Sequence, residues 1–170
     1  MKATSLFIFF QLLFISVVHS QSTDKQVKII KNFTTINSIQ DLLLPFRGRP
    51  VFIDLWASWC EPCKDEFKYS SNLYNQLSKR RVKIIYISID KDTKDSTWKA
   101  DIYNYKLVGY HLKASKALRD ELTTLVWGGI DAYSIPHYML FDSYGKVISK
   151  DMSAPSTTIA LYNQIDEILK

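Results

Sequence analysis

PVFIDLWASWCEPCKDEF, residues 50–67, joins an apolar run to a polar segment that holds both cysteines of the chain. Residues 50–57 are almost continuously apolar and rich in large or β-branched side chains, which is typical of a strand buried on both faces. Beyond the cysteines, apolar side chains recur at helical spacing and predict a helix from about Glu61 to Lys79. Cys60 and Cys63 are therefore expected where a buried strand turns into a helix.

The rest of the chain predicts an α/β fold around this segment. A second strand is expected at residues 82–89, and two strands joined by a helix form a right-handed unit with parallel strands. The other predicted elements are a strand at 27–30, helical turns at 38–44, mainly helical sequence at 96–126 with a break near Gly109 and a second start at Ala114 or Ser115, a hairpin at 138–148 and a helix at 157–169. From residue 50 onward the predicted order is β-α-β-α-β-β-α, a central mixed sheet with helices on both faces.

The first 20 residues have the layout of a cleaved signal peptide. Lys2 precedes a short apolar stretch, and small residues lie three and one positions before the expected cut after Ser20. The alternative is an uncleaved anchor, but the apolar core of about a dozen residues is shorter than the roughly 20 that span a membrane. We expect a lead-in at 21–34, one domain at 35–170, and membrane association only if the leader is uncleaved. The formal charge of +5 is scattered, and no motif supports nucleic-acid binding.

The cysteine spacing favours a redox dithiol. A sulfur at a helix N-terminus is stabilised as thiolate by the free backbone N–H groups, so Cys60 is the candidate nucleophile. Cys63, nearly one turn later, can attack a mixed disulfide formed at Cys60. Pro62 suits a first helical turn because its missing N–H would be unpaired there.

Three other readings of the cysteines are weaker. A zinc site needs about four ligands, and beyond the leader only His111 and His137 could join the cysteines. A structural disulfide closing so short a loop would stabilise the fold weakly. A peroxide-reducing cysteine usually has Thr or Ser three residues ahead, where this chain has Ala57.

The segment FIDLWASWCEPCKDEF resembles the active-site segment of the thioredoxin superfamily, and within it the extracytoplasmic thiol-disulfide oxidoreductases of the TlpA/ResA type found in bacterial envelopes. Ser134-Ile135-Pro136, ahead of the YMLFDSYGKVI hairpin, resembles the cis-proline loop of that family. The similarity covers roughly residues 30–170. It implies a thioredoxin-like fold and a periplasmic or otherwise extracytoplasmic location.

The resemblance also implies roles for individual residues. Cys60 would attack and Cys63 resolve, with their disulfide as the only redox group and no other cofactor or metal. Trp59 would flank and shield the dithiol. Pro136, if not an ordinary trans proline, would be cis and would leave the Ile135 backbone free to pair with a substrate strand.

Two acids compete for the proton of Cys63. Asp54 matches the buried acid of thioredoxins, and burial would raise its pKa toward neutrality. Glu66 stands where TlpA/ResA-type proteins often place a functional Glu, although it could be a solvated helix residue. Glu61, between the cysteines, would disfavour the Cys60 thiolate and so indicates a reducing couple.

The sequence therefore predicts a thiol-disulfide oxidoreductase that reduces disulfides in envelope proteins. An oxidising compartment requires an electron source for a reductase, so a membrane thiol donor is the expected second partner. A disulfide oxidant or isomerase, and a non-catalytic module that binds extended peptides, are the alternatives.

Overall fold

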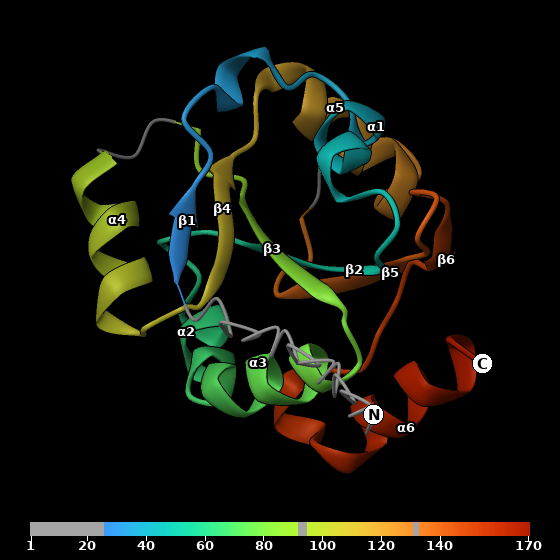
Figure 1. Ribbon diagram of the computed structural model, residues 1–170. Helices are drawn as coiled ribbons and strands as arrows, with labels where there is room; N and C mark the ends of the chain where they lie inside the picture. The colour runs from blue at the N-terminus through green and yellow to red at the C-terminus, as the bar shows by residue number, and fades with distance from the viewer. Residues whose placement is uncertain (1–25, 92–94, 131–132) are drawn as a thin grey trace, which may run out of the picture.

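The computed structural model describes residues 26–91, 95–130 and 133–170 (Figure 1). The predicted signal peptide and the start of the predicted lead-in lie outside these ranges. Across the three ranges, no helix is both long enough and apolar enough to cross a membrane.

A six-stranded sheet with the order β1-β4-β3-β2-β5-β6 forms the centre of the molecule. Its strands are β1 (Val27–Ile29), β2 (Val51–Trp56), β3 (Lys83–Ser88), β4 (Gly109–Lys113), β5 (His137–Phe141) and β6 (Val147–Ser149). The first four strands run parallel, β5 is antiparallel to β2, and β6 is antiparallel to β5. The predicted mixed sheet, parallel unit and late hairpin are confirmed.

Helices cover both faces of this sheet, as predicted. They are α1 (Ile39–Leu43), α2 (Glu61–Phe67), α3 (Ser70–Lys79), α4 (Asp95–Asn104), α5 (Lys116–Trp127) and α6 (Ile159–Ile168), with short 3-10 turns η1 (Phe33–Thr35), η2 (Leu44–Phe46) and η3 (Pro155–Thr157). One apolar cluster contains side chains of α1 and α5, and a second contains side chains of α2, α3, α4 and α6. In Figure 1, α1 and α5 lie together on one side of the sheet, with α2, α3 and α6 on the other.

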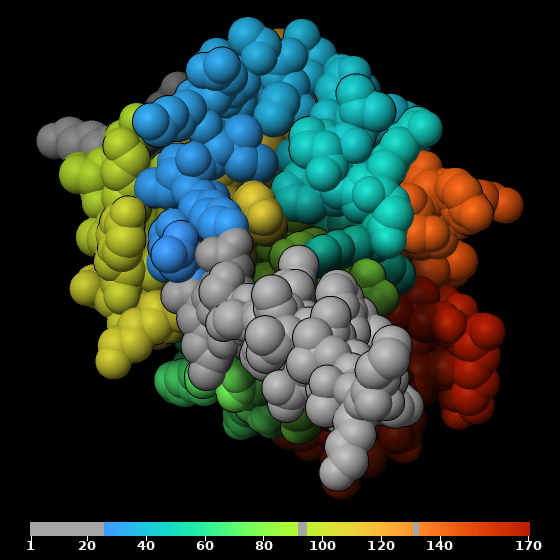
Figure 2. Space-filling model, in the orientation of Figure 1, coloured from blue at the N-terminus to red at the C-terminus, as the bar shows by residue number. Residues whose placement is uncertain are grey.

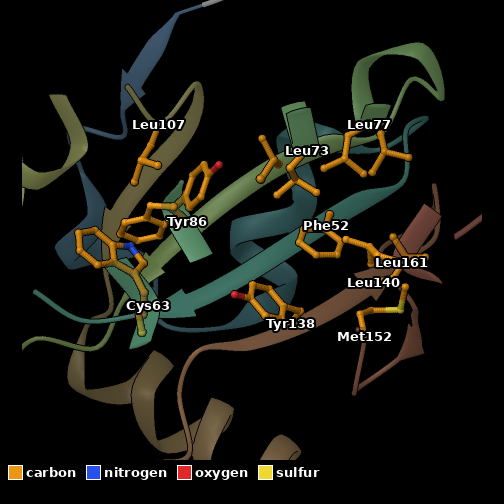
Figure 3. Close-up of a cluster of buried hydrophobic side chains, with 14 of the residues drawn as sticks. Phe52, Cys63, Leu73, Leu77, Tyr86, Leu107, Tyr138, Leu140, Met152 and Leu161 are labelled. Atoms are coloured by element: carbon orange, nitrogen blue, oxygen red, sulfur yellow. The ribbon is translucent and has the colours of Figure 1, made fainter. Parts of the chain in front are cut away.

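Strand β2 is buried along its whole length, because alternate side chains enter the two clusters. Val51, Ile53 and Leu55 face α1 and α5. Phe52 and Trp56 face the α2 side, where Phe52 lies among leucines of α3 and α6 (Figure 3). Asp54 lies between them in the alternation and so faces the α2 side as well.

The prediction of one helix from Glu61 to Lys79 was wrong. The chain turns between α2 and α3, where the N–H groups of Lys68 and Tyr69 donate to carbonyls three residues back instead of four. Ser70 then begins α3, and its hydroxyl donates to the Tyr105 carbonyl at 3.4 Å. The Ser70–Tyr105 contact and the tighter turn at Lys68 and Tyr69 thus divide the segment into two helices. The apolar spacing is the same on both sides of the turn, so it predicted a single helix.

The helical reading of 96–126 missed strand β4. Its sequence GYHLK is only five residues long and mixes polar with apolar side chains, so it carries little periodic signal. The strand is defined by its partners, since it lies between β1 and β3 and pairs with both. The predicted helix start is confirmed at Ser115, whose Oγ accepts from Leu118 N–H.

Candidate active site: a buried dithiol beside a cis-proline loop

Cys60 and Cys63 form a disulfide at the start of α2, with an S–S distance of 2.04 Å. Cys60 is the N-cap of the helix, and its Sγ accepts a hydrogen bond from the Cys63 N–H at 3.2 Å. Pro62 occupies the first turn, where its missing N–H is harmless. The same N–H would favour negative charge on Cys60 in the reduced protein.

The loop ahead of β5 lies against the dithiol. The Ile135–Pro136 peptide bond is cis, as the sequence predicted. The carbonyl oxygen of Ile135 lies 3.7 Å from Cys60 Sγ. Residues separated by 75 positions in the chain are thus brought together at the sulfur predicted to attack.

Trp59 lies on the solvent side of this site, with 59% of its surface exposed. Cys60 and Cys63 are only 4% and 0% exposed, so little of either sulfur is open to water. The shielding role of Trp59 stays a prediction, since its exposed ring is equally suited to contact a partner.

Asp54 is buried, as predicted, and is 2% exposed. It lies directly opposite Tyr86 on β3 and Tyr138 on β5. Burial, and next the charge of Glu66, raise the pKa of the Asp54 carboxyl well above its usual value. A carboxyl whose pKa is raised in this way is a candidate to exchange a proton with a thiol.

Glu66 is not simply a solvated helix residue. Its two carboxylate oxygens accept hydrogen bonds from the N–H and Oγ of Ser156, each at 2.8 Å, which tie α2 to η3. The structure thus brings both predicted acids to the α2 side of the sheet. Asp54 has an oxygen, Oδ1, with no hydrogen-bond partner in the described part of the chain, whereas both Glu66 oxygens are engaged.

Glu61 forms an exposed ion pair with Lys64, with Oε1 and Nζ 2.8 Å apart. The hydrogen bond that Lys64 donates to Glu61 is the main cause that raises the pKa of Lys64. Lys64 was not singled out by the sequence, yet it brings a positive charge to the helix that begins at Cys60. Its charge offsets part of the effect expected of Glu61 on the Cys60 thiolate.

Asp90 is a further site residue that the sequence did not reveal. It is 1% exposed, and its carboxylate accepts from the N–H and Oγ of Ser58, both at 3.0 Å, and from Ser88 Oγ at 2.6 Å. A polar residue just beyond the carboxyl end of β3 was the available signal, because the loop after the parallel strand β2 lies at the same edge of the sheet.

The two histidines outside the leader lie on different strands. His111 is buried on β4, its ring stacks on Tyr86 at 4.8 Å, and burial lowers its pKa to about 4. The His137 ring lies 5.6 Å from that of Trp127. In the part of the chain that the structure describes, no group of three or more His, Cys, Asp or Glu residues could hold a metal ion.

A dithiol where a parallel strand becomes a helix, facing a cis-proline loop that enters an antiparallel hairpin, defines the thioredoxin-like class of proteins. The chain belongs to the Redoxin family, which matches residues 24–165.

Curated relatives and solved structures agree with this assignment. Thiol-disulfide oxidoreductase ResA of Bacillus subtilis is 28% identical over 109 residues, which cover 62% of this chain and 54% of the relative. ResA of Bacillus thuringiensis subsp. konkukian is 30% identical over 128 residues, covering 75% and 66%. The match thus spans about half to two thirds of these relatives.

Two solved structures show the same fold. A thiol:disulfide interchange protein from Bacteroides sp. superposes with a TM-score of 0.56 at 25% identity, covering 74% of this chain and 76% of that one. The thioredoxin domain of a thiol-disulfide oxidoreductase from Bacteroides vulgatus gives 0.58 at 24% identity, covering 75% and 84%. The predicted thioredoxin-like fold is confirmed.

Proposed function

We propose that the chain is a thiol-disulfide oxidoreductase that reduces disulfides in proteins of the bacterial envelope. The observation that carries this proposal is the position of Cys60 Sγ, 3.7 Å from the Ile135 carbonyl oxygen. A substrate segment that pairs in extended form with the Ile135 backbone would place its disulfide at the attacking sulfur. The names of the ResA relatives support the same chemistry.

The reaction needs only the two cysteines and a proton acceptor. The Cys60 thiolate attacks one substrate sulfur, which forms a mixed disulfide and expels the other substrate sulfur as a thiolate. Cys63 gives its proton to Asp54 and attacks Cys60, which forms the Cys60–Cys63 bond and releases the second substrate thiolate. Two electrons pass from the dithiol to the substrate, and both product thiolates take up protons.

We assign the proton of Cys63 to Asp54. The Asp54 carboxyl is buried, and burial raises its pKa well above its usual value, toward the range in which thiols titrate. Glu66 is occupied by Ser156, and its charge acts on Asp54 through space. Glu66 therefore raises the pKa of Asp54 and does not itself take the proton.

The proposed location rests on the signal-peptide layout of residues 1–20. Outside the cytoplasm, a reductase must receive electrons after each turnover, because the surroundings are oxidising. A membrane thiol carrier that reduces the Cys60–Cys63 disulfide would supply them.

An insulin-reduction assay tests the activity. Wild type should reduce insulin, Cys60→Ser should abolish turnover, and Cys63→Ser should accumulate a mixed disulfide at Cys60. A protein that reduces nothing, while partner binding survives both substitutions, would instead be a peptide-binding module.

The direction of electron flow is tested by the reduction potential. We expect a value nearer the roughly −270 mV of thioredoxin than the roughly −120 mV of a strong oxidant. A potential above about −180 mV would assign the protein to the oxidants or isomerases.

A further inference from the structure

We propose that one edge of the central sheet is a membrane-contact surface that binds anionic phospholipid headgroups. The loop before β2, the start of β3 and the turn between β5 and β6 form this edge, which we call the basic edge. The inference goes beyond the proposed function, because this edge carries neither cysteine and its role is binding.

Three segments meet at the basic edge because of the directions of their strands. β2 and β3 are parallel and start together, with Val51 opposite Lys83, and β5 runs antiparallel to β2 and ends at the same edge. The Lys83 N–H donates to the Pro50 carbonyl at 2.9 Å, and the Gly48 N–H donates to the Ser143 carbonyl at 2.8 Å. Residues far apart in the sequence therefore form one continuous surface.

Basic side chains that are scattered in the sequence gather on this surface. Arg47, Arg49 and Lys146 are exposed, and Lys83 is partly exposed. Burial, and next the charges of Arg49 and Lys28, lower the pKa of Lys83. Within the ranges that the structure describes, no carboxylate forms an ion pair with Arg47, Arg49 or Lys146. The basic edge thus carries positive charge that the folded chain does not neutralise by ion pairing.

Two acids near this edge are already engaged. Asp142 Oδ1 accepts from the N–H groups of Tyr144 and Lys146, at 2.8 and 2.9 Å, so this carboxylate serves its own turn. Asp166 accepts two hydrogen bonds from Arg80, each at 2.6 Å. Arg80 is therefore left out of the binding surface.

Two large apolar side chains are exposed to water on the same surface. Tyr144, in the β5–β6 turn, is 79% exposed, and Leu44, in η2, is 59% exposed. Their segments are joined where Gln40 Nε2 donates to the Gly145 carbonyl at 2.9 Å. Figure 2 shows the surface of residues 40–50, in cyan, beside that of the β5–β6 turn, in orange.

A bilayer surface fits this combination of side chains better than an acidic protein or a soluble polyanion. Lys and Arg are attracted to anionic headgroups, and Tyr is favoured where headgroups meet hydrocarbon. Binding of this kind draws on buried apolar area and electrostatic attraction together. A soluble polyanion would use the charges and leave Tyr144 and Leu44 in water.

The strand directions also set how a bound molecule would stand on the membrane. β1, which begins at Val27, is parallel to β2, β3 and β4, so residues 1–25 join the domain at the amino ends of these strands. Cys60 lies beyond the carboxyl end of the six-residue β2, about 20 Å away. The dithiol would therefore face away from the lipid, toward proteins in the surrounding water.

Co-sedimentation with lipid vesicles tests the proposal. Vesicles of phosphatidylglycerol and phosphatidylcholine in equal parts supply an anionic surface, and pure phosphatidylcholine supplies a neutral one. The readout is the ratio of the two partition coefficients, because an apolar leader, if retained, would add about equally to both. We expect the wild type to favour anionic vesicles and to lose this preference at high salt. Equal binding to the two kinds of vesicle would overturn the proposal.

The combined variant Arg47→Gln, Arg49→Gln and Lys146→Gln should lower this ratio about 100-fold, or about fivefold for each charge. The matched control removes the same charge at the opposite edge of the sheet, by glutamine substitution of the exposed residues Lys91, Lys116 and Lys150. The control should lower the ratio less than about fivefold. Equal losses in the two variants would show an effect of net charge alone and overturn the proposal. If the combined variant folds poorly, Arg47→Gln alone should still give its fivefold loss.

Tyr144→Ser distinguishes lipid from a soluble polyanion, because it keeps every charge of the basic edge. It should weaken binding to anionic vesicles and leave binding to heparin unchanged. If Tyr144→Ser leaves vesicle binding unchanged while the combined variant loses heparin binding, the edge binds polyanions through charge alone, and the lipid proposal is wrong.

The orientation is tested on the reduced protein with a maleimide joined to polyethylene glycol. Cys60 should react at the same rate with and without anionic vesicles. A large decrease in rate would mean that lipid covers the dithiol and would overturn the proposed orientation. Neither measurement requires catalysis, so failure of the membrane proposal leaves the proposed function standing. A protein that does not reduce insulin can likewise still bind vesicles.

Discussion

Asp90 accepts hydrogen bonds from both the backbone N–H and the Oγ of Ser58, each at 3.0 Å. Ser58 is buried and lies two residues before Cys60, and the residue between them, Trp59, is 59% exposed. The carboxylate is buried and also accepts from Ser88, so it is satisfied by three donors. Asp90 therefore holds the loop that leads into Cys60 against the end of β3.

Asp90→Asn should lower the free energy of unfolding by about 1–3 kcal/mol, because one acceptor oxygen becomes an NH₂ group that faces other donors. Urea denaturation of the oxidised protein measures the loss. Ser58→Ala is the control and should cost about 1 kcal/mol, since it removes one bond and keeps the backbone donor. If Asp90→Asn and Ser58→Ala lower the free energy of unfolding equally, Asp90 does not hold the loop through several hydrogen bonds.

Gly109→Ala should destabilise the packing of strand β4 against β3. Gly109 has φ +150°, and a Cβ there would lie 2.7 Å from Ile84 Cγ2 and 3.0 Å from the Ile84 carbonyl oxygen. We expect a loss of about 1 kcal/mol from the backbone and a further loss of about 1–3 kcal/mol from crowding against β3. Gly128→Ala, with φ +67° and open space around the position, should show only the backbone part in thermal or urea unfolding.

The fold could be predicted around the dithiol because local signals agree there. The apolar run of β2, the helical spacing after Cys63 and the Gly145 hairpin each indicate their element from a few neighbouring residues. Strand β4 lacks such a signal. Its position is decided by pairing with β1 and β3, which are far away in the sequence.

The residues of the candidate site could also be predicted where a local signal in the sequence marks them. The dithiol of Cys60 and Cys63 follows from a local motif, and the burial of Asp54 follows from its apolar neighbours. The cis bond at Pro136 follows from the resemblance to the cis-proline loop of the thioredoxin superfamily. The side chain opposite Asp54 follows from strand register, which no local pattern specifies. This is why the sequence predicted the burial of Asp54 and not its neighbours Tyr86 and Tyr138.

Asp54→Asn should make the protein more stable, and the gain should depend on pH. The folded-state pKa of Asp54 is raised, so between the unfolded value of about 3.9 and the folded value the folded protein binds more protons than the unfolded chain. Wild type therefore loses stability as the pH rises through this window, by about 1.4 kcal/mol for each unit by which the pKa is raised. The asparagine variant lacks this loss.

Urea unfolding of both proteins between pH 3.5 and pH 8, as a set of roughly half-unit steps, checks this dependence. The two stabilities should converge toward the acid end and separate as the pH rises. The variant should also resolve a mixed disulfide about 100-fold more slowly, the lower range for loss of a general base. A stability difference that is constant with pH would show that Asp54 does not titrate as its burial requires.

Lys64 and Glu61 should shift the reduction potential in opposite directions. Lys64→Gln removes a positive charge from the first turns of α2 and leaves Glu61 unpaired, so the Cys60 thiolate becomes less stable and the couple more reducing. Glu61→Gln should make the couple less reducing for the converse reason. The side chain of Lys64 is 21% exposed and that of Glu61 is 79% exposed. Because solvent screens such a pair, each shift in potential should be small, about 10–30 mV.

Equilibration with glutathione or dithiothreitol measures these potentials, and the same measurement at high salt supplies a control. Screening by salt should reduce both shifts, because the charges act through solvent as well as through the helix. The double variant should return close to wild type, since the two charges it removes have opposite signs. Shifts of the same sign in both single variants would show that the substitutions act through the packing of α2 instead of through charge at Cys60.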